Sequence, residues 1–167
     1  MIAKVARTDP IGATLDPAVL DRIAGQLDAA RVPWMVWAYN ESIVRDPAAP
    51  AGRDNVRSLA ALESLARPYP LAVTGTPTAV AFDPATDAYE LTYATTGPDG
   101  RRYPRRLPTV VSVPSLRYPD GYTVEATGAT VTSRPCADRL ALRTRPHATT
   151  VTLRLTPGPP AGGCHRR

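Results

Sequence analysis

Apolar residues follow two different patterns along the chain, and the pattern changes near residue 67. From Thr14 to Arg31 they recur every three or four positions, which predicts an amphipathic helix. Asp16 stands at the expected N-cap and Pro17 at the first helical position. Val32 to Tyr39 is a short, almost wholly apolar run, which is typical of a strand covered on both faces of a parallel sheet.

A second helical pattern precedes the change. Residues Asp54 to Arg67 again show helical spacing, with Asn55 or Asp54 as the expected cap. Helix, buried strand, loop and helix in this order predict a piece of an α/β repeat. We expect a domain boundary at Arg67-Pro68-Tyr69-Pro70, because two prolines end the helix and the residues beyond them lose helical periodicity.

Beyond the boundary, short β-rich runs are separated by turn signals such as Gly97-Pro98-Asp99-Gly100 and Pro119-Asp120-Gly121. Several short strands spaced in this way predict an antiparallel β-sandwich. The runs are Ala79–Phe82, Ala88–Ala94, Thr109–Val113, Tyr122–Ala126, Thr130–Thr132, Leu140–Thr144 and Thr149–Leu155. The expected fold class is α+β overall, with an α/β piece in residues 1–67, a sandwich in residues 68–156 and a disordered tail in residues 157–167.

Composition and charge add little to this picture. Hydrophobic residues make up 43% and charged residues 21%, as in ordinary soluble domains, while 19 prolines favour a turn-rich, β-rich body. The net charge of +5 comes almost wholly from arginine, since Lys4 is the single lysine. The arginines are scattered rather than gathered on one face, which argues against nucleic-acid binding. The tight run of Arg101, Arg102, Arg105 and Arg106 is expected to be a solvated loop.

Cysteine and histidine give no sign of a metal or cofactor. Cys136 and Cys164 lack CxxC or Cys/His ligand spacing, and their redox state stays open. His147 and His165 fall in a turn and in the tail, without a ligand partner at suitable spacing. No run of residues predicts a membrane span or a signal peptide, so the chain is expected to be cytoplasmic as written, and secreted if it is a fragment of an exported enzyme.

Three stretches of the sequence resemble a known enzyme family. They are DPAVLDRIAGQLDAARVPWMVWAYNES, LARPYPLAVTGTPTAVAFDPATDAYELTYAT and VPSLRYPDGYTVEATGA. Together they resemble bacterial endoglycoceramidases and related enzymes of glycoside hydrolase family 5, and the likeness runs from about Gly12 to about Leu155. In that family a (β/α)8 barrel carries a C-terminal β-sandwich.

The resemblance implies that residues 1–67 are the end of such a barrel. Asp16–Arg31 would be the seventh barrel helix, Pro33–Tyr39 the eighth strand and Asp54–Arg67 the eighth helix. The implied activity of the whole enzyme is hydrolysis of O-glycosyl bonds, and the implied partner is a glycan or glycolipid.

Both tryptophans, Trp34 and Trp37, lie in the run WMVWAYNE. Because alternate residues of a strand point to opposite faces, the two rings are not expected to line one pocket. Core packing would explain both rings. In the family, however, a tryptophan at the end of the last strand stacks on the sugar, and the resemblance implies Trp37 for this role, with Asn40 and Glu41 beside it at the carboxyl end of the strand.

A retaining glycosidase needs two carboxyl groups about 5 to 5.5 Å apart. The family's acid/base lies on the fourth barrel strand, which would precede residue 1. Its nucleophile lies in a stretch reading Glu-Phe-Gly-Ala, where this chain has Pro10-Ile11-Gly12-Ala13, so that Pro10 takes the place of the glutamate. Asp9 is one position away and would face the other side of the strand, and Glu41 is a single carboxylate. Both are weak candidates for catalysis, and no catalytic pair is found.

Three interpretations stay open. The chain is the C-terminal fragment of a family 5 glycosidase and inactive by itself, or a module whose sandwich binds carbohydrate or glycolipid, or a structural domain that completes a separately encoded barrel. The module would use exposed aromatic residues, of which Tyr69, Tyr103, Tyr118 and Tyr122 are the candidates. The segment Tyr118-Pro-Asp-Gly-Tyr122 is the place to look, although a turn flanked by core tyrosines explains it as well.

Overall fold

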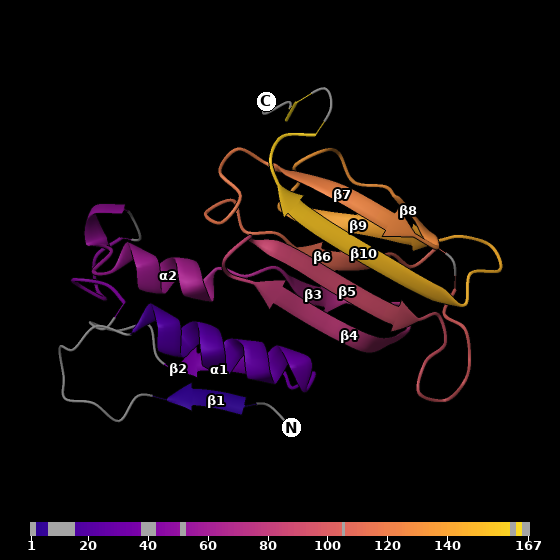
Figure 1. Cartoon of the computed structure of the whole chain (residues 1–167), viewed down its shortest axis with the longest axis horizontal. Coiled ribbons are helices and arrows are strands. Elements are labelled where there is room, and N and C mark those ends of the chain that lie inside the picture. Colours follow the sequence, from indigo (N-terminus) through magenta and orange to yellow (C-terminus); the bar gives the residue numbers. More distant parts are fainter. Residues whose placement is uncertain are drawn as a thin grey trace. The chain divides into compact units, whose positions relative to one another are not determined.

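The computed structural model describes residues 3–6, 16–37, 43–50, 53–104, 106–160 and 163–164. The chain divides into two compact units, Met1–Ala66 and Arg67–Arg167, and each is described by itself. Both α-helices of the described residues belong to the first unit, and two antiparallel sheets form the body of the second (Figure 1). The chain is therefore a mixed α and β protein.

The first unit is built around one parallel strand pair. Its elements are β1 (Ala3–Ala6), α1 (Pro17–Ala29), β2 (Trp34–Trp37), a short 3-10 helix (Arg53–Asn55) and α2 (Leu59–Leu65). Strands β1 and β2 run parallel, with Ala3 opposite Trp34 and Ala6 opposite Trp37. Since α1 connects these two strands along the chain, β1, α1 and β2 form a βαβ crossover.

The first helix begins where the sequence predicts. The Asp16 carboxylate accepts a hydrogen bond from the Ala18 backbone N–H at 2.8 Å, and Pro17 occupies the first helical position. The first N–H groups of a helix have no partner within the helix. The Asp16 carboxylate is the partner of one of them, and Pro17 has no N–H that needs a partner. The buried face of α1 contains Leu20 and Ala24, as the apolar spacing requires.

The second helix begins later than predicted, so the expected cap at Asn55 or Asp54 is wrong. Ser58 caps α2 instead, because its hydroxyl accepts a hydrogen bond from Ala61 N–H at 3.2 Å. Asn55 has another partner: its side chain bonds the backbone N–H and C=O of Asp46 at 2.9 and 2.8 Å. An asparagine that bridges a loop in this way cannot also cap a helix.

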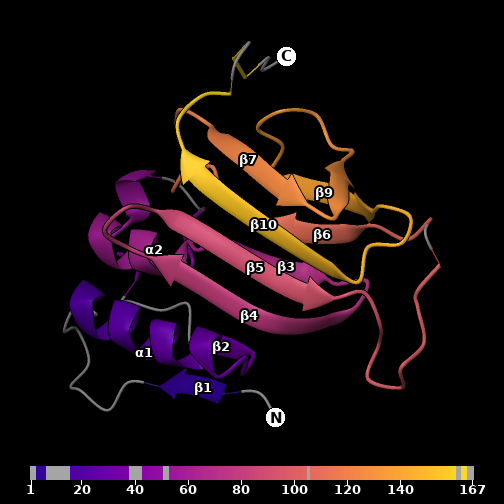
Figure 2. The ribbon, with the colours of Figure 1, turned by 45° about the vertical axis from the view of Figure 1, so that its right-hand side comes forward.

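The second unit is a β-sandwich of two four-stranded antiparallel sheets. One has the order β4-β5-β10-β7 and the other β3-β6-β9-β8. The strands are β3 (Tyr69–Ala72), β4 (Thr76–Asp83), β5 (Ala88–Ala94), β6 (Thr109–Ser112), β7 (Tyr122–Thr127), β8 (Ala129–Val131), β9 (Arg139–Thr144) and β10 (Thr150–Pro157). Figure 2 shows β10 running between β5 and β7.

The sandwich core follows from strand alternation. Along β10, Val151, Leu153 and Leu155 are fully buried, whereas Thr152 and Arg154 between them are exposed. The facing sheet contributes residues such as Leu140 and Leu142 to the same hydrophobic cluster. Both sheets thus bury one face each against the other, which is the arrangement that period-2 alternation predicts.

A short polar chain crosses this core. The Thr109 hydroxyl on β6 donates to the Tyr93 hydroxyl on β5 at 3.0 Å, and Thr74 N–H donates to the Thr109 oxygen at 3.1 Å. Because buried polar groups without partners are costly, this chain of bonds fixes how the two sheets meet at that point.

The predicted strands are all present, with shifts of a few residues at their ends, and the described part of residues 68–156 contains no helix. One strand was missed. β3 includes Pro70, where the sequence predicts a break. The proline is tolerated because β3 is an edge strand with a register shift after Pro70, where a ladder N–H is not required.

Candidate functional site

The tryptophan strand is only partly defined. Trp34 donates from its indole Nε1 to the Asp28 carboxylate of α1 at 3.1 Å, so this ring is anchored to the helix. Met35, the next residue, is 49% exposed, and the expectation of a strand covered on both faces is wrong for this position. Trp34 is therefore a structural residue of the first unit.

The other residues of the predicted sugar site lie beyond what the structure describes. Trp37 ends β2 and pairs with Ala6 through its backbone, but its side chain is outside the described residues. Asn40, Glu41 and Asp9 lie outside them as well. The roles suggested for these four residues stay predictions.

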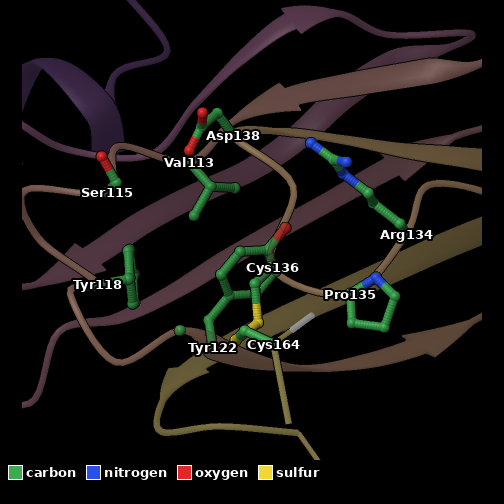
Figure 3. A pocket seen from close by; sticks show the side chains of 10 residues that line it. Val113, Ser115, Tyr118, Tyr122, Arg134, Pro135, Cys136, Asp138 and Cys164 are labelled. Carbon is green, nitrogen blue, oxygen red and sulfur yellow. A yellow bond between two sulfur atoms is a disulfide. The ribbon is translucent and has the colours of Figure 1, made fainter. Parts of the chain in front are cut away.

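The second unit has a pocket at the other place that the sequence singled out, the turn between Tyr118 and Tyr122 (Figure 3). Its volume is about 230 Å³, which is below the roughly 300 to 1,000 Å³ of drug-sized ligand sites. The polar groups in its wall come from Ser115, Arg134 and Asp138.

The two tyrosines are core residues, and their expected use as exposed binding aromatics is wrong. Tyr118 is 2% and Tyr122 3% exposed, and their rings meet edge to face with centroids 5.8 Å apart. Each hydroxyl donates to a backbone carbonyl at 2.7 Å, that of Asp87 for Tyr118 and that of Ala137 for Tyr122. The pair therefore fastens the turn to two neighbouring loops. Tyr69 and Tyr103 are the exposed members of the predicted set, at 53% and 42%.

Charged residues stabilise the outer side of this turn. Arg117 pairs with the Asp87 carboxylate at 2.6 Å and donates to the Pro84 carbonyl at 3.1 Å. Its guanidinium also lies 5.2 Å from the centre of the Phe82 ring, close enough for a cation–π contact. These contacts tie the Tyr118 turn to the β4–β5 connection and hold the pocket's wall in place.

A disulfide closes the inner side of the pocket. Cys136 and Cys164 are bonded, with Cα atoms 5.5 Å apart and a sequence separation of 28 residues. Gly121 permits the bond, because a Cβ at this position would overlap the sulfur atoms of both cysteines. Gly121 also has a φ of +94°, which a side chain would strain. The redox state that the sequence left open is thus a disulfide in this structure.

The electrostatics of the pocket keep both tyrosines neutral over a wide pH range. Burial raises the pKa of Tyr122 to about 12, and the nearby Asp138 charge adds to the effect. The pKa of Tyr118 is raised more than that of Tyr122, first by burial and then by the nearby Asp87 charge. A hydroxyl that stays protonated keeps donating to its carbonyl, so the tyrosines serve the structure rather than proton transfer.

Among the described residues that line the pocket, Asp138 is the single carboxylate, whereas a retaining mechanism uses two. Among the described residues no group of histidine, cysteine, aspartate and glutamate side chains is suited to hold a metal ion. In the same part of the chain, no helix is long and apolar enough to cross a membrane.

Sequence reasoning located this turn but missed the disulfide that borders it. The bond joins a loop after β8 to the segment after β10, and nothing in the cysteine spacing indicates such a pair. The signal available was Gly121 in a Pro-Asp-Gly turn, since a glycine with positive φ often marks a close approach of another part of the chain.

Comparison with known proteins identifies the sandwich. Residues 67–156 match the glycoside hydrolase family 5 C-terminal domain. The chain is 32% identical over 123 residues to endoglycoceramidase I of Rhodococcus hoagii (strain 103S), an alignment that covers 73% of this chain and 22% of that protein. The chain therefore spans less than a quarter of this curated relative.

Solved structures share the fold over most of the chain. One is endo-glycoceramidase II from Rhodococcus sp., solved as a lactosyl-enzyme intermediate. The superposition covers 94% of this chain and 33% of that enzyme, with a TM-score of 0.62 and 23% sequence identity. Cryptococcus neoformans sterylglucosidase 1 matches 90% of this chain with 24% of its own, at a TM-score of 0.62 and 14% identity. At these identities the likeness concerns the fold alone.

Proposed function

The chain belongs to the glycoside hydrolase family 5 C-terminal domain family, and on that premise we propose that it is the C-terminal part of a glycosidase similar to endoglycoceramidase. In this proposal the sandwich is the family's accessory domain and the first unit is the end of a (β/α)8 barrel. The substrate of the whole enzyme is a glycolipid, as the name of the curated relative suggests.

One observation carries the proposal: the fold likeness to the solved endo-glycoceramidase II extends well beyond residues 67–156 and covers nearly all of the chain. A sandwich that had been joined to unrelated sequence would match over its own residues only. The parallel pairing of β1 and β2 supports the same assignment, since adjacent strands of a (β/α)8 barrel are parallel and joined through a helix.

The chain by itself does not hydrolyse glycosidic bonds in this proposal. The nucleophile and the acid/base must share one pocket, and each contributes orders of magnitude to the rate. Pro10 stands at the position of the nucleophile, and Asp138 is a lone carboxylate in its pocket.

Incubation of the purified chain with a glycosylceramide and with an aryl β-glycoside tests this. We expect no released oligosaccharide or chromophore above the buffer blank. Turnover that disappears in Glu41→Gln or Asp9→Asn would contradict the proposal, because it would require one of these carboxylates to act with a second group. Glu125→Gln, which removes an exposed carboxylate of β7 outside both candidate sites, is the matched control.

Trp37 is the residue we propose as a sugar platform. An aromatic ring at the carboxyl end of a barrel strand offers area to the C–H face of a sugar, and Asn40 beside it offers hydrogen bonds. Titration of the chain with lactose, followed by tryptophan fluorescence, is expected to show weak binding that Trp37→Ala abolishes and Trp34→Phe retains. Equal loss in both variants, with circular dichroism unchanged, would instead indicate a general packing effect.

A second candidate function is a glycan-binding module, and the pocket beside Tyr122 is the observation that favours it. Its serine, arginine and aspartate supply donors and an acceptor for sugar hydroxyls. If the module interpretation holds, Asp138→Ala rather than Trp37→Ala removes lactose binding. The two variants therefore separate the two candidates in one titration.

A further inference from the structure

The connection between β5 and β6 extends beyond the ends of the sheets in both views of the ribbon (Figures 1 and 2). Its first part is an ordered hairpin. Thr96 pairs with Arg102, and Gly97 N–H donates to the Arg101 carbonyl at 2.8 Å. Tyr103 packs beside Gly97, where a Cβ would lie 3.2 Å from its ring. The loop is therefore a built structure.

A small pocket lies at the base of this hairpin. Its volume is about 100 Å³. Arg102 and Arg145 line it from two different connections, together with Thr95 and Thr144. The rim carries Tyr103 and Leu107, which are 42% and 43% exposed.

Two threonines line the pocket. The Thr95 hydroxyl donates to the Ala148 carbonyl at 2.8 Å, so its proton is committed. The Thr144 hydroxyl oxygen is buried from solvent and has no hydrogen-bond partner within the described part of the chain. Because solvent does not reach this oxygen, a ligand in the pocket does not reach it either, and the two arginines are the groups that can recognise a ligand here.

The charge around the pocket is positive. Arg102 has no carboxylate partner among the described residues, and Arg145 uses only its Nε, which donates to the Thr130 hydroxyl at 3.2 Å. Arg101 is highly exposed and reaches Asp99 only at 4.0 Å, and Arg106 is exposed too. Guanidinium groups without a carboxylate partner suit planar or tetrahedral anions.

From these observations we propose that the β5–β6 loop and its pocket form a docking site for a membrane surface that contains anionic phospholipid. The phosphate or carboxylate of one head group lies between Arg102 and Arg145. Tyr103 and Leu107 enter the interface, where tyrosine and apolar side chains flanked by arginine are favourable. This inference does not rest on the proposed glycosidase function.

A nucleic-acid partner fits the same residues less well. Single-stranded nucleic acids are bound by several aromatic rings in a row along a basic groove, and this loop offers one tyrosine and one exposed leucine. An exposed apolar side chain beside a basic pocket suits a lipid interface better than a phosphate backbone.

Co-sedimentation of the full chain with vesicles tests the proposal. We expect binding to vesicles of phosphatidylcholine mixed with phosphatidylserine, and little binding to phosphatidylcholine alone. Arg102→Gln with Arg145→Gln should weaken partitioning by on the order of fivefold per arginine. Tyr103→Ser with Leu107→Ser should weaken it even at low salt. Arg154→Gln, an exposed arginine on β10, is the matched control and should bind normally.

Several results would overturn the proposal. Equal loss in Arg154→Gln and in the pocket variants would mean attraction by net charge alone. Perturbation of the Thr144 amide signal by inorganic phosphate, without vesicle binding, would mean a free anion as the ligand. Binding of duplex DNA that the same variants abolish, again without vesicle binding, would mean a nucleic-acid site. The glycosylceramide assay is independent of all these outcomes, so each proposal can fail alone.

Discussion

The two units of the chain differ in how far they cover their own apolar residues. In the sandwich, two sheets close over one another, and residues such as Leu91, Leu142 and Leu153 are completely buried. Among the described residues of the first unit, the buried apolar side chains are those of Leu20, Ala24, Ile43, Val44 and Ala61. Large apolar side chains are exposed in both units, such as Met35 at 49% in the first and Leu71 at 45% in the second. An antiparallel sandwich forms its whole core from one stretch of sequence, because its two sheets cover each other. A single βαβ crossover has only two strands and one helix, so it buries less apolar surface by itself.

This comparison predicts where substitutions have the largest effect. Leu153→Ala on β10 should lower the free energy of unfolding by about 2 to 5 kcal/mol, because it leaves a cavity in a core that both sheets share. Thr152→Ala, the exposed neighbour on the same strand, should change it by less than about 0.5 kcal/mol. Chemical denaturation followed by tyrosine fluorescence measures both. A small effect of Leu153→Ala would mean that the sandwich is loosely packed.

The disulfide is the next largest contribution. The two cysteines are 28 residues apart, and loss of a bond that closes a loop of this length costs roughly 3.6 kcal/mol in the chain-entropy account. Cys136→Ser with Cys164→Ser, or a reducing agent on the unmodified chain, should therefore lower the melting temperature of the sandwich and leave the first unit as it is. A melting curve that reductant does not alter would contradict a stabilising role.

Alkaline pH should weaken the sandwich through its buried tyrosines. The pKa of Tyr122 is about 12 in the folded chain and about 10 in an unfolded one. Because the folded value is raised, the stabilisation is fully present below pH 10 and is lost as the pH rises through 12. Tyr118 acts in the same direction. Tyr122→Phe should flatten the decline of stability in this window, and an unchanged pH profile would show that the burial of its hydroxyl has no energetic consequence.

The smallest effect is expected in the first unit. Ser58→Ala removes the cap of α2 and should cost about 1 kcal/mol of local stability. Hydrogen exchange of the α2 amides is the suitable measurement, because a global melt would be dominated by the sandwich. Asp54→Ala, at the cap position that the sequence favoured, should leave α2 exchange nearly unchanged. Faster exchange in Asp54→Ala than in Ser58→Ala would reverse the assignment of the cap.

Local signals in the sequence predicted most of the fold. The Asp16 cap, the Pro17 start and the period-2 runs of β5 and β10 depend on neighbouring residues, so they can be recognised without the tertiary structure. β3 was missed because the tolerance of Pro70 depends on an edge position in the sheet, which the local sequence does not encode.

The site was less predictable than the fold, for the same reason. The Tyr118 to Tyr122 turn could be found, but whether its hydroxyls face solvent or backbone carbonyls depends on loops that are distant in the sequence. The same holds for the disulfide and for the orphan Thr144 hydroxyl beside Arg102. Trp37, Asn40, Glu41 and Asp9 remain predictions from the family resemblance.

The most direct test of the difference between the units is calorimetry of residues 67–167 alone beside the whole chain. If the sandwich is a complete domain, the shorter protein should unfold in one cooperative transition, at the same temperature and with the same reductant sensitivity as the main transition of the whole chain. A shorter protein that is unfolded, or that melts well below the whole chain, would contradict the account, because the sandwich would then depend on the first unit for its stability.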